Sequence, residues 1–341
     1  MNTVPEGGKI SLRYIGAVRP QGLFSVGQPA KLPDGRLLLL YSDMLKGRPL
    51  GSTKIWGIIS VDGGFTWSKP ELLIHRDDCN ACGPRSVSAR DGSLFIFYLR
   101  FVRWADYTAE SKSDVAFYIR REDSLKFTEE GLILDGYCAA GGAIETSKEN
   151  VVLALEAVDN DAKETVSIAF VSFDRGRTFK QSNILRVKTP PQKDYPEEMG
   201  AMEPTVVELS DGRLLMFMRT RLGYQFESYS KDQGLTWSEP KQSSLASGNA
   251  PAYLLGLADG RIACSWNPKD RSAFHLAVSE DDGKTWKDLG PIAEGGSVCY
   301  SFMIELTPNE LYIVWNNVTG DAFSWHYVTI EALRATLPPK R

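Results

Sequence analysis

A short repeated turn motif constrains the fold of this chain more than any other feature. The pattern Ser-x-Asp-x-Gly-x-Thr, followed by an aromatic residue, occurs at residues 60–67, 172–179, 230–237 and 279–286. Ser and Asp side chains accept hydrogen bonds from nearby backbone N–H groups, and Gly readily adopts a positive φ. Each copy therefore predicts a tight turn that holds a β-hairpin, with the aromatic ring packed beneath it. A degenerate fifth copy is expected at residues 121–127.

A second repeat lies between these turns and consists of a polar turn that leads into an apolar strand. Its copies are residues 33–41, 90–98, 148–156, 210–218, 258–266 and 308–316. Six units in 341 residues give roughly 57 residues each, the length of one β-meander. Because one meander cannot bury both of its faces, we expect an all-β, six-bladed β-propeller of four-stranded antiparallel blades. The propeller is predicted to form a single domain over residues 1–341.

The last unit lacks the turn motif, which suggests how the ring closes. We expect both ends of the chain to share this blade, with residues 10–18 pairing near residues 325–330. Residues 330–336 are predicted to form a short helix because their sequence, IEALRAT, is rich in helix-forming residues.

Composition excludes several classes of function. The net charge of −4 leaves no basic excess to bind a nucleic acid, and no apolar run approaches the roughly 20 residues that span a membrane. The first residues contain no secretion signal, and an odd count of five cysteines argues against a disulfide framework. We therefore expect a cytoplasmic protein, or a secreted one if a signal peptide has been removed.

Neither a metal nor another cofactor is expected. The three histidines, His75, His275 and His326, are scattered without the spacing of metal ligands. Cys79 and Cys82 form a C-x-x-C pair, but no second pair completes a zinc site. The oligomeric state is left open by the sequence.

Four such turns on a chain of six β units resemble the Asp-boxes of the sialidase (neuraminidase) superfamily, and the resemblance covers nearly the whole chain. Residues 202–219 are similar to the sialidase strand pair that carries a nucleophile-activating Glu and the second Arg of a substrate-binding triad. The resemblance assigns these roles to Glu203 and Arg219. It places the third Arg at Arg271 and the nucleophilic Tyr at Tyr300.

The chemistry of this residue set is coherent. A sialic acid carries a carboxylate on its anomeric carbon, so a neutral phenol approaches it without the repulsion that an Asp or Glu nucleophile would meet. A Tyr with a pKa near 10 needs a neighbouring base to take its proton, and Arg binds a carboxylate through two parallel hydrogen bonds. The resemblance thus implies a retaining exo-glycosidase for α-linked sialic acid or a related ulosonic acid, with a glycan or small acidic sugar as its partner.

The first unit departs from the family pattern in two ways. Sialidases carry the first Arg of the triad there, but residues 24–30 keep only the Pro. Arg85 is the leading candidate to replace it, and Arg19 and Arg48 are weaker ones.

The catalytic acid/base Asp of the family also has no clear counterpart. Asp43, Asp78 and Glu145 are candidates, and the sequence does not rank them. Two alternatives follow. One is a two-carboxylate glycosidase for a neutral sugar such as arabinofuranose, in which Glu203 acts with Glu145 or Asp43. The other is a propeller that binds glycans without cleaving them.

Overall fold

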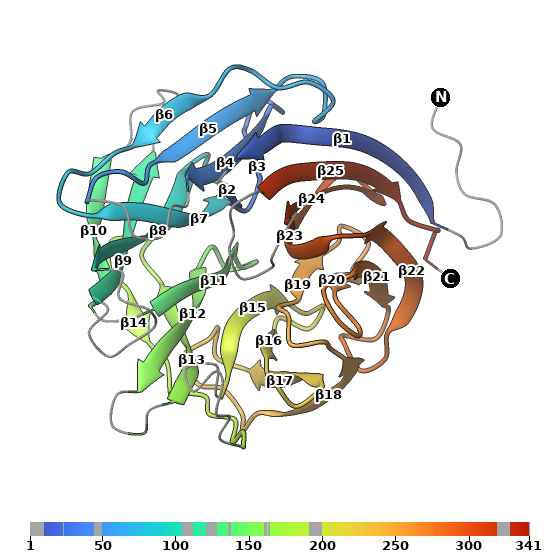
Figure 1. Cartoon of the computed structure of the whole chain (residues 1–341). Coiled ribbons are helices and arrows are strands. Elements are labelled where there is room, and N and C mark those ends of the chain that lie inside the picture. Colours follow the sequence, from blue (N-terminus) through green and yellow to red (C-terminus); the bar gives the residue numbers. More distant parts are fainter. Residues whose placement is uncertain are drawn as a thin grey trace.

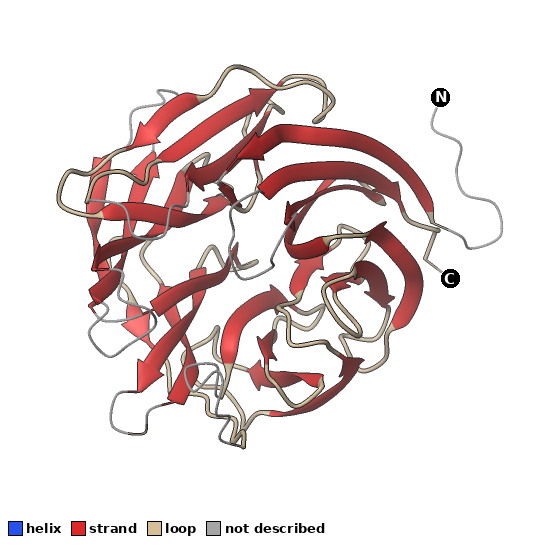
Figure 2. Cartoon of the chain, viewed as in Figure 1, coloured by secondary structure: helices blue, strands red, loops and turns tan. Residues whose placement is uncertain are grey.

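The computed structural model describes residues 10–22, 24–43, 50–103, 112–120, 128–135, 138–159, 162, 164–190, 200–318 and 328–340. In this part of the chain the regular elements are 25 strands, and no helix occurs (Figure 2). The all-β prediction is confirmed. Among the described residues, no helix of the length and apolarity needed to cross a membrane is found.

The strands form six antiparallel sheets arranged as the blades of a propeller (Figure 1). Blade 1 contains β2 (Phe24–Val26), β3 (Ala30–Lys31), β4 (Leu37–Asp43), β5 (Ile55–Ser60) and β6 (Glu71–Ile74). Blade 2 contains β7 (Asn80–Ser88), β8 (Leu94–Arg103), β9 (Lys112–Arg120) and β10 (Thr128–Asp135). Blade 3 contains β11 (Cys138–Glu145), β12 (Val151–Asp159), β13 (Glu164–Ser172) and β14 (Lys180–Gln181). Blade 4 contains β15 (Met202–Glu208), β16 (Leu214–Arg219), β17 (Tyr224–Ser230) and β18 (Lys241–Ala246). Blade 5 contains β19 (Tyr253–Gly256), β20 (Ile262–Trp266), β21 (Ala273–Ser279) and β22 (Lys287–Glu294). Blade 6 contains β23 (Ser297–Thr307), β24 (Glu310–Val318), β25 (Val328–Thr336) and β1 (Ser11–Gly22).

The core is a ring of apolar layers between neighbouring blades. The turn-strand repeats supply the second strand of each blade, and β4 and β16 show how completely these strands are buried. One apolar cluster joins blades 1 and 2, and others join blades 2 and 3, 3 and 4, and 4 and 5. A further cluster joins blades 5, 6 and 1 and completes the ring. The six-bladed prediction is therefore confirmed.

Both ends of the chain close the ring, as predicted. β1 pairs with β25 in the sixth blade, with Ser11 opposite Thr336 and Ala17 opposite Glu331, a register different from the expected one. The predicted helix at residues 330–336 is wrong, because these residues belong to β25. Since β25 is hydrogen-bonded to β1 on one side and β24 on the other, strand pairing outweighs local helix propensity.

The repeated turns have the predicted structural role. In the first copy, Ser60 Oγ accepts the Gly64 N–H at 2.8 Å, and Asp62 Oδ1 accepts the Thr66 N–H at 2.9 Å. Gly64 has a φ of 92°, and the Trp67 indole donates to its carbonyl. The other three copies repeat the two backbone bonds. The degenerate copy at residues 121–127 lies outside the described residues.

Candidate active site

The innermost strands of four blades contain the same irregularity. At one place in each of these strands, two consecutive residues lie opposite a single residue of the second strand. The places are between Cys82 and Arg85 in blade 2, between Ala140 and Ala143 in blade 3, between Met202 and Thr205 in blade 4, and between Cys299 and Phe302 in blade 6. Each is a β-bulge, a feature that re-aims side chains. The first bulge residue is Gly83 in blade 2, Gly141 in blade 3, Glu203 in blade 4 and Tyr300 in blade 6.

The bulges of blades 4 and 6 hold side chains in a strained backbone conformation. Glu203 has a φ of 39° and Tyr300 a φ of 55°, values that non-glycine residues rarely adopt. Each such residue costs on the order of 1–3 kcal/mol and persists only where its surroundings impose it, most often at functional sites. The backbone thus marks the two residues that the resemblance assigned to proton transfer and nucleophilic attack.

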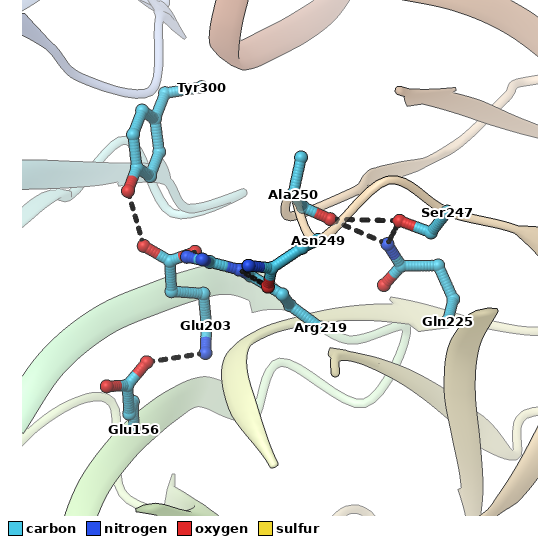
Figure 3. Close-up of polar contacts among 8 residues, drawn as sticks. All are labelled: Glu156, Glu203, Arg219, Gln225, Ser247, Asn249, Ala250 and Tyr300. Carbon is cyan, nitrogen blue, oxygen red and sulfur yellow. Dashed lines mark hydrogen bonds and ion pairs between the residues drawn. The ribbon is translucent and has the colours of Figure 1, made fainter. Parts of the chain in front are cut away.

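The two strained residues meet near the axis of the propeller. Tyr300 Oη donates a hydrogen bond of 2.6 Å to Glu203 Oε1, as Figure 3 shows. The other carboxylate oxygen, Oε2, accepts a hydrogen bond of 2.7 Å from Arg219 Nη1, and both side chains are largely buried. Asn249 Oδ1 accepts a bond from Arg219 Nε at 3.0 Å and fixes the far side of the guanidinium.

The electrostatics of this cluster set opposite protonation states for Glu203 and Tyr300. Burial would raise the pKa of Glu203, but the charge of Arg219 and the hydrogen bonds from Tyr300 and Arg219 outweigh it and lower this pKa. Burial and the negative charge of Glu203 raise the pKa of Tyr300 well above 10. At neutral pH the pair is therefore a phenol that donates to a carboxylate, the arrangement in which the carboxylate can take the phenol proton.

Arg271 brings a second positive charge to the pair. Its guanidinium carbon lies 5.6 Å from the centre of the Tyr300 ring, and the guanidinium also contacts the Cys299 thiol. Among the described residues, no carboxylate forms an ion pair with Arg271. This cation is therefore in a position to bind an anionic group of a ligand.

Arg85 reaches the same centre but has other partners. Its Nε donates to the Gly141 carbonyl at 2.8 Å and its Nη1 to the Pro84 carbonyl at 3.0 Å, while the guanidinium stacks over the Phe302 ring. Burial lowers the pKa of Arg85 to about 10, and the charge of nearby Glu203 partly opposes this shift. Arg85 thus joins blades 2, 3 and 6, with two of its nitrogens bonded to backbone.

Of the two weaker candidates for the missing arginine, Arg19 can be placed and has a partner outside the cluster. Arg19 lies on β1, the outermost strand of blade 6, with its guanidinium over the Tyr41 ring. Arg48 lies outside the described residues. In the first unit, Gln28 bonds the Ala143 carbonyl of blade 3 through its side-chain amide.

Each of the three candidate acids has a hydrogen-bond partner other than Glu203 and Tyr300. Asp43 accepts a bond from the Trp56 indole. Asp78 is exposed, and its hydrogen bonds with Arg76 lower its pKa to about 2. Glu145 ends β11 at the turn, where it accepts the Arg90 N–H, and burial raises its pKa.

Sequence reasoning missed Glu156, whose carboxylate contacts the site. Glu156 Oε2 accepts the backbone N–H of Glu203 at 2.7 Å, and its side chain is buried (Figure 3). A signal was present, because Glu156 ends its turn-strand repeat where the other copies end in Tyr, Met, Trp or Asn.

Asn249 was also missed. It has a φ of 52° and follows Gly248, whose N–H is bonded to the Asn267 carbonyl. Gln225 donates to Ser247 Oγ and to the Ala250 carbonyl and so anchors the loop that carries Asn249 (Figure 3).

No group of three or more His, Cys, Asp or Glu side chains that could hold a metal ion occurs in the described part of the chain. The thiols of Cys79, Cys82, Cys264 and Cys299 are free and buried.

Comparison with known proteins places the chain in a family. The model of a BNR repeat-like domain matches residues 89–313. The chain belongs to the BNR repeat-like family. No curated protein matches the sequence of this BNR repeat-like protein.

Solved structures share the fold of this BNR repeat-like protein at low sequence identity. A Dyadobacter fermentans protein of unknown function is 15% identical with a TM-score of 0.75, over 99% of this chain and all of the other. The Hadza microbial sialidase Hz136 is 17% identical with a TM-score of 0.71, over 93% of this chain and 68% of the sialidase.

The Trypanosoma rangeli sialidase in complex with sialic acid is 16% identical with a TM-score of 0.63, over 92% of this chain. The chain spans about half, 54%, of that protein. Identities this low show the fold, and the predicted sialidase-like propeller is confirmed.

Proposed function

We propose that this BNR repeat-like protein is a retaining exo-glycosidase of the sialidase type, acting on an α-linked sialic acid or a related acidic ulosonic sugar. The contact of 2.6 Å between Tyr300 Oη and Glu203 Oε1 carries the proposal. A glycan-binding propeller has no need of a buried phenol held on an ionised carboxylate. Two further cations, Arg219 and Arg271, adjoin the pair and suit a substrate that carries a carboxylate.

In the first step the sugar carboxylate lies against Arg271 and Arg219 and presents the anomeric carbon to Tyr300. The phenol oxygen attacks this carbon as its proton passes to Glu203, and the glycosidic C–O bond breaks. The leaving oxygen takes a proton from an acid that we do not assign. In the second step water attacks the anomeric carbon and gives a proton to the conjugate base of that acid. The tyrosyl C–O bond breaks, and Glu203 returns its proton to the phenol oxygen.

The two-carboxylate alternative has less support. It needs Glu145 or Asp43 beside Glu203, but Glu145 is bonded to a backbone N–H at a turn and Asp43 to an indole. It also gives no role to the cation of Arg271. We further propose that residues 1–341 act as one domain with this single axial site.

The test combines turnover with trapping of the covalent intermediate. Purified protein is assayed with 4-methylumbelliferyl α-glycosides of sialic acid and of its deaminated analogue, and with aryl arabinofuranosides. A 3-fluoro-ulosonosyl fluoride should label Tyr300, detected by peptide mass spectrometry, and Tyr300→Phe should abolish labelling. Turnover of the aryl arabinofuranosides but not of the two ulosonic acid glycosides supports the two-carboxylate alternative. Binding of a carboxylate-bearing glycal without turnover of any glycoside supports the binding propeller.

A further inference from the structure

The backbone at Glu203 is held by a side chain from the neighbouring blade. The bulge removes Glu203 from the ladder, because pairing with β16 skips from Met202 to Thr205. The Glu203 N–H instead donates to Glu156 Oε2 at 2.7 Å. A carboxylate is the strongest acceptor a side chain offers for such a bond.

The conformation that this bond holds sets the direction of the Glu203 side chain. In an extended strand successive side chains point to opposite faces, so a regular backbone at Glu203 would shift the register and turn the carboxylate. The left-handed conformation at residue 203, with a φ of 39°, aims the carboxylate at Tyr300 and Arg219.

The position of Glu156 is an unusual one for a carboxylate. Residues 151–155 of the same strand, β12, are apolar and buried, and the Glu156 side chain is only 8% exposed. Burying a carboxylate is unfavourable unless its oxygens receive hydrogen bonds. The Glu203 N–H supplies one such hydrogen bond to the Glu156 carboxylate.

We propose that Glu156 is a positioning residue, whose carboxylate fixes the left-handed backbone of Glu203 and so aims the Glu203 carboxylate at the Tyr300 phenol. The expected effect of Glu156 on turnover rests on the proposed function. The expected effect of Glu156 on the geometry of Glu203 and Tyr300 is independent of the proposed function.

The test compares Glu156→Ala, which removes the acceptor, with Glu156→Gln, which keeps an acceptor oxygen. Glu208→Ala is the matched control, because Glu208 also accepts a backbone N–H across the interface of blades 3 and 4, that of Ser147 at 2.6 Å, but at the turn end. We expect kcat of Glu156→Ala to fall on the order of 10- to 100-fold with KM changed less than about threefold, as for a displaced catalytic group. Glu156→Gln should recover most of the loss, and Glu208→Ala should show none.

A second measurement does not depend on turnover. The ionisation of Tyr300 is followed by ultraviolet difference titration against Tyr300→Phe, and the backbone at residue 203 by crystallography of each variant. In Glu156→Ala the phenol should ionise at lower pH than in wild type, because Glu203 has moved away.

Failure of the wild-type protein to cleave any ulosonoside would overturn the proposed function alone. A wild-type phenol titration and an unchanged φ at residue 203 in Glu156→Ala would overturn the role of Glu156. If Glu156→Ala does not fold, the same two measurements on Glu156→Gln test the role of Glu156. In that variant, a Tyr300 pKa shifted as far as in Glu203→Gln would contradict the role of the acceptor oxygen.

Discussion

The first residue of the bulge is glycine in blades 2 and 3, and it is Glu203 in blade 4 and Tyr300 in blade 6. At Gly141 an added Cβ would overlap the Pro204 carbonyl oxygen and lie 2.8 Å from the Ala154 carbonyl oxygen. At Gly83, with a φ of 58°, it would meet only the Leu99 side chain, at 3.4 Å. Gly141 thus allows close packing of blades 3 and 4, and Gly83 allows a positive φ, while the bulges at Glu203 and Tyr300 place the two side chains of the candidate site. The four blades share the bulged register, and the residue at the bulge determines what each blade contributes.

The largest expected effect tests the reactive side of this comparison. Tyr300→Phe removes the proposed nucleophile, so kcat should fall on the order of 10³-fold or more. A carboxylate-bearing glycal should still bind, measured by calorimetry, because Arg219 and Arg271 remain. Retained turnover in this variant would show that the phenol does not form the covalent intermediate.

The next effect tests the packing side. Gly141→Ala forces blade 3 away from Pro204, the residue that follows Glu203, and should lower the free energy of unfolding by about 2–4 kcal/mol. Urea denaturation measures the loss. Turnover of the folded fraction should also fall, since the displaced carbonyl of Pro204 belongs to the bulge that carries Glu203. A loss no larger than that of Gly83→Ala would contradict the close approach.

A third effect concerns the residue that holds Arg219. Asn249→Ala removes the acceptor for Arg219 Nε, so kcat/KM should fall about tenfold, as for loss of a hydrogen bond to a charged group. Steady-state kinetics measure the change. Asn249→Asp keeps an acceptor oxygen and is the control. Equal losses in both variants would indicate that the loop, and not this bond, matters.

A smaller effect separates backbone strain from collision. Gly83→Ala keeps enough space but places an alanine at a positive φ, so the free energy of unfolding should fall by about 1 kcal/mol. Gly212→Ala, at a turn with a φ of 81° and open space around it, should cost the same. If Gly83→Ala lowered the free energy of unfolding much more than Gly212→Ala, a steric clash like that expected at Gly141 would be indicated at Gly83.

The smallest effect belongs to the turns that all these blades share. Burial would raise the pKa of Asp62, but hydrogen bonds from Thr66 and Ser60 outweigh it and lower this pKa to about 2, below its ordinary value of 3.8. The stabilisation by Asp62 is therefore complete above about pH 4 and is lost as the pH falls through 2. Because the carboxylate is exposed, the contribution should be below about 1 kcal/mol. Unfolding of Asp62→Asn between pH 2 and 6 should depend less on pH than that of wild type.

Local repeats made much of the fold predictable from the sequence. The turns around Asp62 and its equivalents, and the strands that follow the second repeat, depend on contacts within a few residues. Residues 330–336 were mispredicted because their partners in β1 lie more than 300 positions away and leave no local pattern.

The site was predictable only where a family motif covered it. Glu203, Arg219 and Tyr300 meet as the resemblance implied. The contacts of Arg85 and Glu156 are with a carbonyl and an N–H of other blades, and backbone atoms carry no residue signature.

The pairing of Ser11 with Thr336 has a consequence for synthesis of the chain. β1 is translated before the other strands of the propeller, and its partner in the ring, β25, is translated after all five intervening blades. Until residue 336 has left the ribosome, the first and last apolar layers stay open and exposed to other chains. Ring closure is therefore a late, long-range folding step, and chaperone binding during translation should concentrate on these two open edges.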